Sequence, residues 1–163
     1  MYKNGGYTIV EVAVVIAVIG ILATVTLFSV RGLDVKANDR ERESDATSIA
    51  RQVELVYNNQ TLGTPTYPGT TSVDATSTRD SIFGGKQADI TRAPSQTSFS
   101  IVKATNATAT TAGVLPQPTK TTYVFQPLTL AGALCSSSCS KFNLYYYQES
   151  TNTVVMIKSL KQQ

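Results

Sequence analysis

The most unusual chemical group in this sequence is Glu11, an acidic residue near the start of a long apolar segment. The stretch NGGYTIVEVAVVIAVIGILA (residues 4–23) contains no other charged residue. An ionised carboxylate at the centre of a membrane-spanning helix costs about 2.5 to 3.5 kcal/mol on insertion scales. We therefore expect that something either neutralises the charge of Glu11 or makes use of it.

Residue types that commonly carry out catalysis or bind metals are scarce. The chain has no histidine, and so it lacks the commonest general base near neutral pH and the commonest metal ligand. It also shows no Gly-rich phosphate loop and no dense acidic cluster typical of a calcium site. The sequence predicts no catalytic residues, no metal and no cofactor, and we expect a protein that is not an enzyme.

Two cysteines, Cys135 and Cys139, flank the sequence Ser-Ser-Ser. We favour a disulfide between them, because an exported domain meets an oxidising environment. Two thiols without histidine are a poor zinc site, and the spacing is not that of a C-x-x-C redox motif. The closed loop is short, so we expect a gain of about 2 to 3 kcal/mol and a role in holding one exposed turn.

The segment from Val12 to Val30 contains no charged residue. A helix of about 20 residues spans the hydrocarbon core of a bilayer, so this segment is long enough to do so. A secretory signal peptide is one alternative, but its apolar core is shorter, about 7 to 15 residues, and ends in a small-residue cleavage site. A plain single-pass anchor is the other alternative.

The helix is predicted to continue well beyond the apolar segment. No proline occurs before Pro65, and no glycine occurs between Gly32 and Gly63. One apolar stripe follows the helical period, which favours packing against a body; it consists of Ile49, Val53, Val56 and Tyr57. We predict one continuous helix from about Thr8 to about Asn59.

Charged residues crowd the middle of this helix, in the stretch DRERESD (residues 39–45). Asp39 with Arg42, and Arg42 with Asp45, have the i,i+3 spacing of ion pairs on a helix surface, each worth a few tenths of a kcal/mol. We interpret the stretch as a solvated helix face. The net charge of +3 is too small to predict nucleic acid as the main partner, although a weak contact between a basic patch and DNA stays open without support.

The rest of the chain is predicted to form strands joined by loops rich in threonine, such as residues 67–80 and 104–113. Segments rich in aromatic and β-branched residues are typical of strands; they are residues 98–104, 121–130, 141–150 and 153–160. Such strands need an apolar cover, which the helix stripe can supply. We therefore predict an α+β fold in which a long helix packs on a small antiparallel sheet.

The start of the chain resembles the type IV pilin family, including the pseudopilins. The residues that carry the resemblance are Gly6, Tyr7, Thr8, Ile9, Val10 and Glu11, which match the family pattern with Tyr in place of the usual Phe. The resemblance implies four parts with different roles. These are a leader peptide (1–6), a transmembrane or filament-core half of the helix (7–30), an amphipathic half (31–60) and a sheet-containing head (61–163).

The resemblance also implies roles for single residues. A prepilin peptidase would cut between Gly6 and Tyr7 and methylate the new amine of Tyr7. Glu11 would pair with the N-terminal amine of a neighbouring subunit during assembly. Gly20 matches a glycine at which family helices gain flexibility, but Phe28 stands where many pilins have proline, so unwinding would depend on Gly20.

The expected function is that of a structural subunit of a type IV pilus or related filament. A minor pilin or pseudopilin of a secretion or competence system is an alternative, and a membrane-anchored surface protein that forms no filament is another. The implied partners are further copies in a helical filament, the prepilin peptidase and the assembly machinery of the cytoplasmic membrane. The subunit would lie in that membrane before assembly and on the cell surface afterwards.

The distribution of basic residues disagrees with this orientation. Basic residues usually accumulate on the cytoplasmic side of a membrane helix. Here Lys3 precedes the apolar segment, whereas four basic residues follow it, namely Arg31, Lys36, Arg40 and Arg42. The family motif predicts that the leader lies inside, and we give it more weight than the charge count.

Overall fold

The computed structural model describes residues 6–61, 63–77, 79–85 and 88–162. Residues 1–5 of the predicted leader, which include Lys3, lie outside the described residues. The chain forms two compact units, Met1–Ala37 and Asn38–Gln163.

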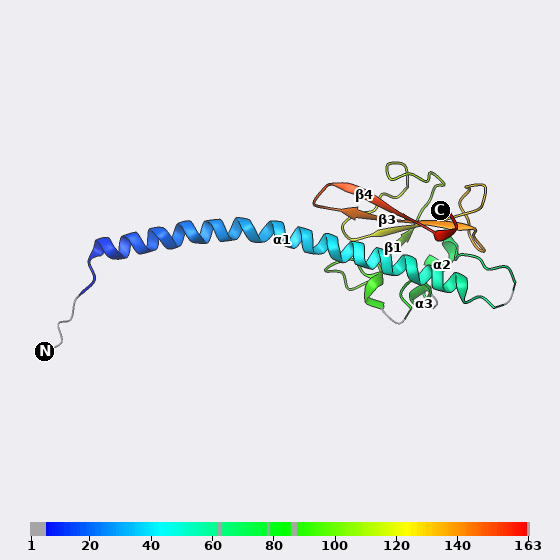
Figure 1. Ribbon diagram of the computed structural model, residues 1–163, viewed down its shortest axis with the longest axis horizontal. Helices are drawn as coiled ribbons and strands as arrows, with labels where there is room; N and C mark the ends of the chain where they lie inside the picture. Colours follow the sequence, from blue (N-terminus) through cyan, green and yellow to red (C-terminus); the bar gives the residue numbers. More distant parts are fainter. Residues whose placement is uncertain (1–5, 62, 78, 86–87, 163) are drawn as a thin grey trace. The chain divides into compact units, whose positions relative to one another are not determined.

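The predicted continuous helix is confirmed. Helix α1 (Ile9–Asn58) begins and ends within a residue of the prediction and is unbroken at Gly20 (Figure 1). Its segment Ile9–Thr26 has a mean hydropathy of 2.6, and none of these 18 residues is buried. By length and composition this segment can cross a membrane.

The second unit contains a four-stranded sheet with the order β1-β2-β3-β4 (Figure 1). The strands are β1 (Ile101–Lys103), β2 (Tyr123–Leu128), β3 (Lys141–Gln148) and β4 (Thr153–Lys158), and each lies within one of the predicted strand segments. β2, β3 and β4 pair antiparallel, as predicted. The α+β class is thereby confirmed.

The prediction of a wholly antiparallel sheet is wrong at one edge, because β1 pairs parallel with β2. Parallel neighbours need a crossover connection of about a dozen residues or more, whereas antiparallel ones can be joined by a tight turn. The Thr-rich segment 104–122 is long enough for such a crossover. The strand composition alone gave no signal for this direction.

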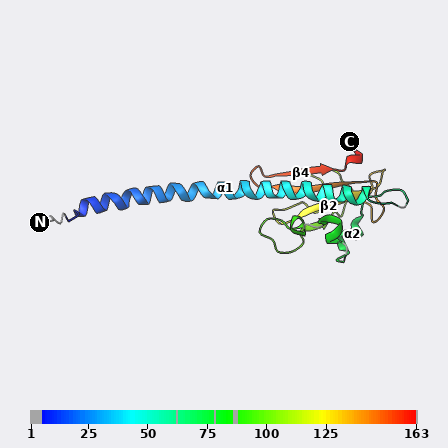
Figure 2. The ribbon, with the colours of Figure 1, turned by 60° about the horizontal axis from the view of Figure 1, so that its bottom comes forward.

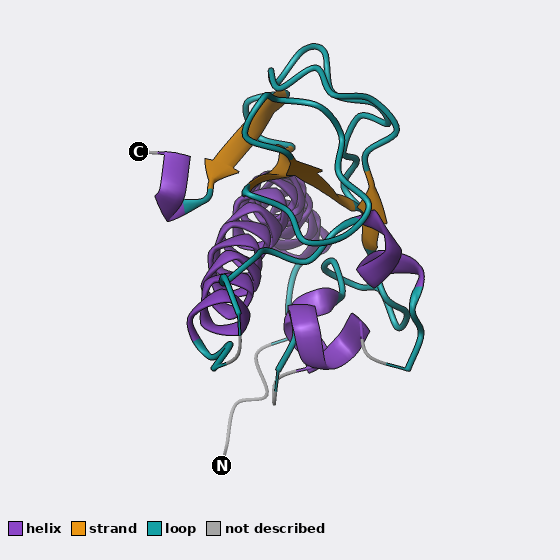
Figure 3. Ribbon diagram, turned by 90° about the vertical axis from the view of Figure 1, so that its right-hand side faces the viewer, coloured by secondary structure: helices purple, strands orange, loops and turns teal. Residues whose placement is uncertain are grey.

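The two faces of the sheet have different covers (Figures 2 and 3). The second half of α1 lies over one face, where Ile49 and Val53 are fully buried against Phe125, Phe142 and Leu144. Loops cover the other face, where the loop residues Ala104 and Val114 form a smaller cluster with Val124 of β2 and Tyr145 of β3. Neighbouring strand residues such as Leu144 and Tyr145 point to opposite faces, as the pleat requires.

The segment predicted as a loop at residues 67–80 contains helix, so that prediction is wrong in part. Two short helices, α2 (Thr70–Asp74) and α3 (Arg79–Phe83), occur here, and the 3-10 helices η1 (Ala88–Thr91) and η2 (Leu160–Gln162) follow later in the chain. α2 and α3 bury one apolar side chain each, Val73 and Phe83. Tertiary packing of these two side chains favours the short helices, which have no periodic pattern of their own.

The interpretation of residues 39–45 as a solvated face is wrong for its inward-facing members. Asp39 and Arg42 retain only 4% and 3% of their exposure and form an ion pair of 2.8 Å. Asp39 also accepts hydrogen bonds of 2.8 Å from the backbone N–H groups of Glu149 and Ser150. The pair therefore joins α1 to the turn between β3 and β4.

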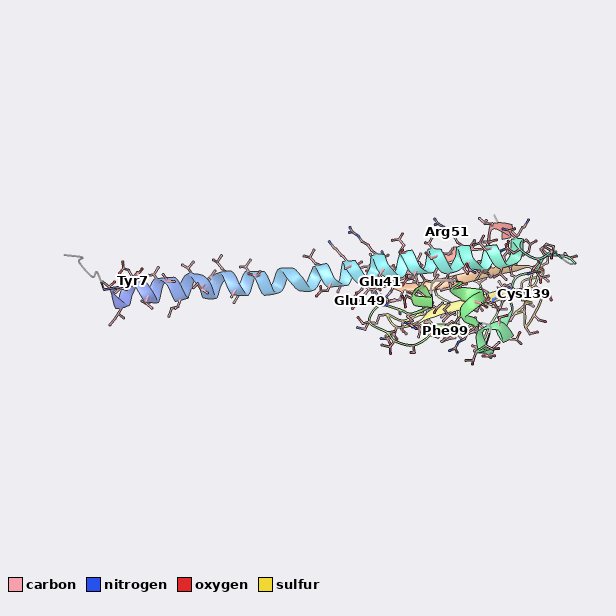
Figure 4. All side chains as sticks on the ribbon, turned by 90° about the horizontal axis from the view of Figure 1, so that it is seen from below. Tyr7, Glu41, Arg51, Phe99, Cys139 and Glu149 are labelled. Atoms are coloured by element: carbon pink, nitrogen blue, oxygen red, sulfur yellow. A yellow bond between two sulfur atoms is a disulfide. The ribbon has the colours of Figure 1, made fainter. Side chains whose placement is uncertain are left out.

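The structure contains the expected disulfide between Cys135 and Cys139. Both cysteines are buried, however, so its role is not confined to an exposed turn. The backbone of Tyr67 pairs with that of Cys139, and Thr70 N–H donates to the carbonyl of Cys135. The disulfide loop therefore holds the segment that follows α1, at the end of the head away from Glu149 (Figure 4).

Candidate assembly site at the start of the helix

Glu11 is bound to the first turn of its own helix. The backbone N–H and the hydroxyl of Thr8 both donate to Glu11 Oε2, each over 2.9 Å. The N–H of Glu11 donates back to Thr8 Oγ1 over 3.2 Å. This reciprocal arrangement is a capping box, which satisfies backbone N–H groups that have no partner within the helix.

Sequence analysis missed the role of Thr8, although a signal was present. The stretch Thr8-Ile9-Val10-Glu11 has the spacing of a capping box directly before an apolar run. We interpreted Thr8 only as part of the family pattern. The structure shows that Thr8 is the residue that positions the Glu11 carboxylate.

The capping box leaves part of the carboxylate free. Both bonds from Thr8 end on Oε2, and no described protein group donates to Oε1. A negative charge at the N-terminus of a helix is favoured by the helix dipole, so Glu11 can stay ionised there. An external cation can reach Oε1 without disrupting the cap.

The residues around Glu11 are open to their surroundings. Tyr7, the residue before the cap, is 88% exposed and lies at the start of α1 (Figure 4). Large apolar side chains follow along the helix, of which Ile9, Val10 and Val12 are all more than half exposed. Such a continuous apolar surface must be covered by lipid or by protein.

A family model matches residues 1–27, and its description is the prokaryotic N-terminal methylation motif. The chain carries the signature of type IV prepilins and pseudopilins. This prepilin signature covers the capping box and the apolar part of α1 and ends before the head. It implies processing by a prepilin peptidase and points to a structural protein. No match was found among curated proteins or among solved structures.

The other residues singled out in the sequence are distributed over both units. Gly20 lies within unbroken helix, and beyond its own helical turn no described atom lies within 4 Å of where its Cβ would be. Gly6 is similarly unobstructed, whereas the side chain of Phe28 lies outside the described residues. Among the described residues no cluster of three or more potential metal ligands occurs.

Proposed function

We propose that this protein is a structural subunit of a type IV pilus or a related filament, made as a precursor and assembled through α1. The observation that carries the proposal is the prepilin motif, which places an ionisable capping residue, Glu11, in the first turn of an exposed apolar helix. Such a helix anchors the subunit in the cytoplasmic membrane before assembly. In the filament, neighbouring helices would cover the same surface.

Leader removal would create the assembly group. Cleavage after Gly6 gives Tyr7 a free amine, which is methylated and stays cationic at neutral pH. Exposure of Gly6 and Tyr7 supports access by a peptidase. In an apolar helix bundle, that amine would find its partner in the Glu11 carboxylate of an adjacent subunit.

Glu11 would thereby set the register between subunits. Leaving one member of a buried ion pair without its partner costs about 3 to 5 kcal/mol, so subunits that slide out of register are penalised. The free Oε1 supports this role, because a neighbouring amine can bind it while Thr8 still holds Oε2. Gly20 would supply flexibility if the helix has to bend within the filament.

Two related functions share this mechanism. A minor pilin or a pseudopilin of a secretion or competence system would use the same motif in a short filament, and either stays an alternative. In both cases the prepilin peptidase and the membrane assembly machinery would be the partners. A monomeric surface anchor is the alternative from another class, and it requires that the leader is not cut.

The first experiment is the intact mass and N-terminal sequence of the protein purified from its own host. We expect the chain to begin at methylated Tyr7. A chain that still begins at Met1 would contradict the proposal and favour the plain anchor. A start beyond residue 25 would instead indicate a secreted domain.

A second experiment compares Glu11→Ala with Thr8→Ala in cells that assemble the filament. Thr8→Ala removes the cap, at a cost of about 1 kcal/mol, but keeps the carboxylate. We expect Glu11→Ala to abolish incorporation into filaments and Thr8→Ala to reduce it only moderately, with both proteins still in the membrane. Equal losses would mean that Glu11 serves the helix cap alone.

A further inference from the structure

Strand β4 is an unprotected edge of the sheet. It is the last strand in the order and carries the apolar run Val154, Val155, Met156 and Ile157, all of them only half-buried. Natural proteins commonly protect such edges with proline, bulges or inward-pointing charges. β4 contains none of these, and its one charged residue, Lys158, stands at its end.

The outward-facing backbone groups of β4 can be identified from the ladder. Ser159 N–H donates to the carbonyl of Phe142 over 2.9 Å, and the antiparallel pattern alternates from there. The N–H and C=O groups of Val154, Met156 and Lys158 therefore point away from β3. Within the described part of the chain, no backbone group pairs with them.

A groove adjoins this edge, between the end of β4 and the last turns of α1. Its volume is about 430 Å³, and its apolar lining includes Ala50, Leu55, Ile157 and Leu160. Leu55 and Leu160 are 51% and 61% exposed. An apolar side chain of a bound strand would cover both of these leucines.

The rim of the groove is basic. Arg51 and Lys158 both line it, and neither forms an ion pair with any described residue. Arg51 lies on the outer side of α1 (Figure 4). Glu54 also lines the groove, but its carboxylate already accepts hydrogen bonds of 2.8 Å from the Tyr67 hydroxyl and from Leu160 N–H, and the two basic residues outnumber it. The groove can therefore attract a carboxylate.

We propose that the free edge of β4 binds an extended segment of another protein, which adds to the sheet as a fifth strand. The bound segment places an apolar side chain in the groove and an acidic side chain two residues further along, on the same face of the strand, against Arg51 and Lys158. Main-chain hydrogen bonds to Val154, Met156 and Lys158 supply affinity, and the groove and its basic rim supply specificity. This surface lies on the head and is independent of the assembly role proposed for α1.

The test uses the full chain in detergent micelles and three fluorescent peptides, with binding followed by anisotropy. The first peptide alternates valine and threonine and ends in leucine, threonine and glutamate, so that the leucine and the glutamate lie on the same face of the added strand. The second replaces the glutamate by lysine, and the third is N-methylated at alternate backbone positions. We expect the first peptide to bind and each of the others to bind at least tenfold more weakly.

Three variants locate the site. Met156→Pro removes an outward N–H and should weaken binding at least tenfold, whereas the control Met156→Leu keeps that group and should leave binding unchanged. Lys158→Glu should weaken the glutamate peptide and strengthen the lysine peptide. If Met156→Pro does not fold, the N-methylated peptide still tests strand pairing on the unaltered protein.

Several outcomes would overturn the proposal. No binding at millimolar peptide would do so, and so would equal binding of the N-methylated peptide. Unchanged binding by both Met156→Pro and Lys158→Glu would place the peptide elsewhere. Concentration-dependent dimers that Met156→Pro abolishes would show that a second copy of this chain, and no foreign strand, occupies the edge.

Discussion

At the scale of single residues, three acidic side chains of α1 join this helix to other segments of the second unit. Asp39 binds the β3–β4 turn, Asp45 accepts a hydrogen bond of 3.2 Å from the Tyr123 hydroxyl, and Glu54 binds Tyr67 and Leu160. All three stand on the inward side of the helix, among apolar residues. Each exchanges part of its contact with water for a hydrogen bond to the sheet or a loop, so its protonation state in the folded protein affects the stability of this unit.

Asp39 should contribute strongly. Burial alone would raise the pKa of its carboxyl, but hydrogen bonds from Ser150 and Glu149 and the charge of Arg42 together lower it. Asp39→Ala leaves the buried Arg42 with only the longer 3.6 Å pair to Glu149 and its bond to the Lys120 carbonyl, and we expect a loss of about 3 kcal/mol in the free energy of unfolding. Urea denaturation measures this loss. Glu43→Ala, which removes an exposed acid from the same helix, is the control and should change little.

Asp45 should make the head more stable in mild acid. Desolvation raises the pKa of its carboxyl to about 6, from an ordinary value of 3.8, even though the Tyr123 hydroxyl opposes the shift. The folded state therefore binds an extra proton between these values, and its stability falls as pH rises through that window. Asp39, whose pKa is lowered, acts in the opposite sense and loses its contribution as pH falls.

Asp45→Asn should remove the penalty that Asp45 imposes at neutral pH. We expect a gain of about 1 to 2 kcal/mol at pH 7.5, after allowance for solvent screening of a half-exposed group, and little change at pH 4. Thermal unfolding at the two pH values checks this, with the exposed Asp80→Asn as control. A loss of stability at both values would show that the Tyr123 bond matters more than the charge.

At the scale of elements, the segment that follows α1 approaches the disulfide loop closely at Gly69. A Cβ on Gly69 would lie 2.0 Å from the carbonyl oxygen of Ser136, which is far inside contact distance. The backbone bond from Thr70 N–H to Cys135 continues this contact. The two segments can therefore pack only if residue 69 has no side chain.

Gly69→Ala should destabilise the head by about 2 kcal/mol or more, because backbone atoms must move to make room. Denaturation under oxidising conditions measures the change. Thr70→Ala, at the neighbouring position, retains the backbone bond and should cost less than about 0.5 kcal/mol. Similar values for the two variants would mean that the disulfide loop is mobile enough to adapt.

At the scale of the whole molecule, the two units differ in the exposure of their apolar residues. Among the residues of Met1–Ala37 whose burial is described, the apolar ones are exposed except the half-buried Val35, whereas the buried core consists of residues from Asp39 onward. Stability of the head should therefore not depend on the apolar half of α1. Membrane or filament contact would be needed only for that half.

A fragment of residues 31–163 should thus fold and stay in solution without detergent. We expect a single cooperative thermal transition and a far-UV spectrum of mixed helix and sheet. A fragment of residues 47–163 lacks Asp39, Arg42 and Asp45 and should unfold at a much lower temperature or fail to fold. Aggregation of the longer fragment would contradict the independence of the head.

Local sequence patterns were sufficient to predict the long helix, the start of its apolar segment, the strands and the motif at Glu11. These features depend on local periodicity, on the absence of proline and glycine and on short spacings, all of which can be read along the chain. Cys135 and Cys139 were also paired correctly, because the chain contains no other cysteine. The Thr8 capping box could have been predicted from a short spacing of the same kind.

Other features became visible only once the chain was folded. Nothing local distinguishes the buried Asp39 and Arg42 from the exposed Glu43, because their burial depends on a turn about a hundred residues later. The parallel direction of β1, the contact at Gly69 and the groove beside β4 likewise depend on segments that meet only after folding. Local patterns specify elements, whereas the burial of charges and the direction of strands depend on which elements become neighbours.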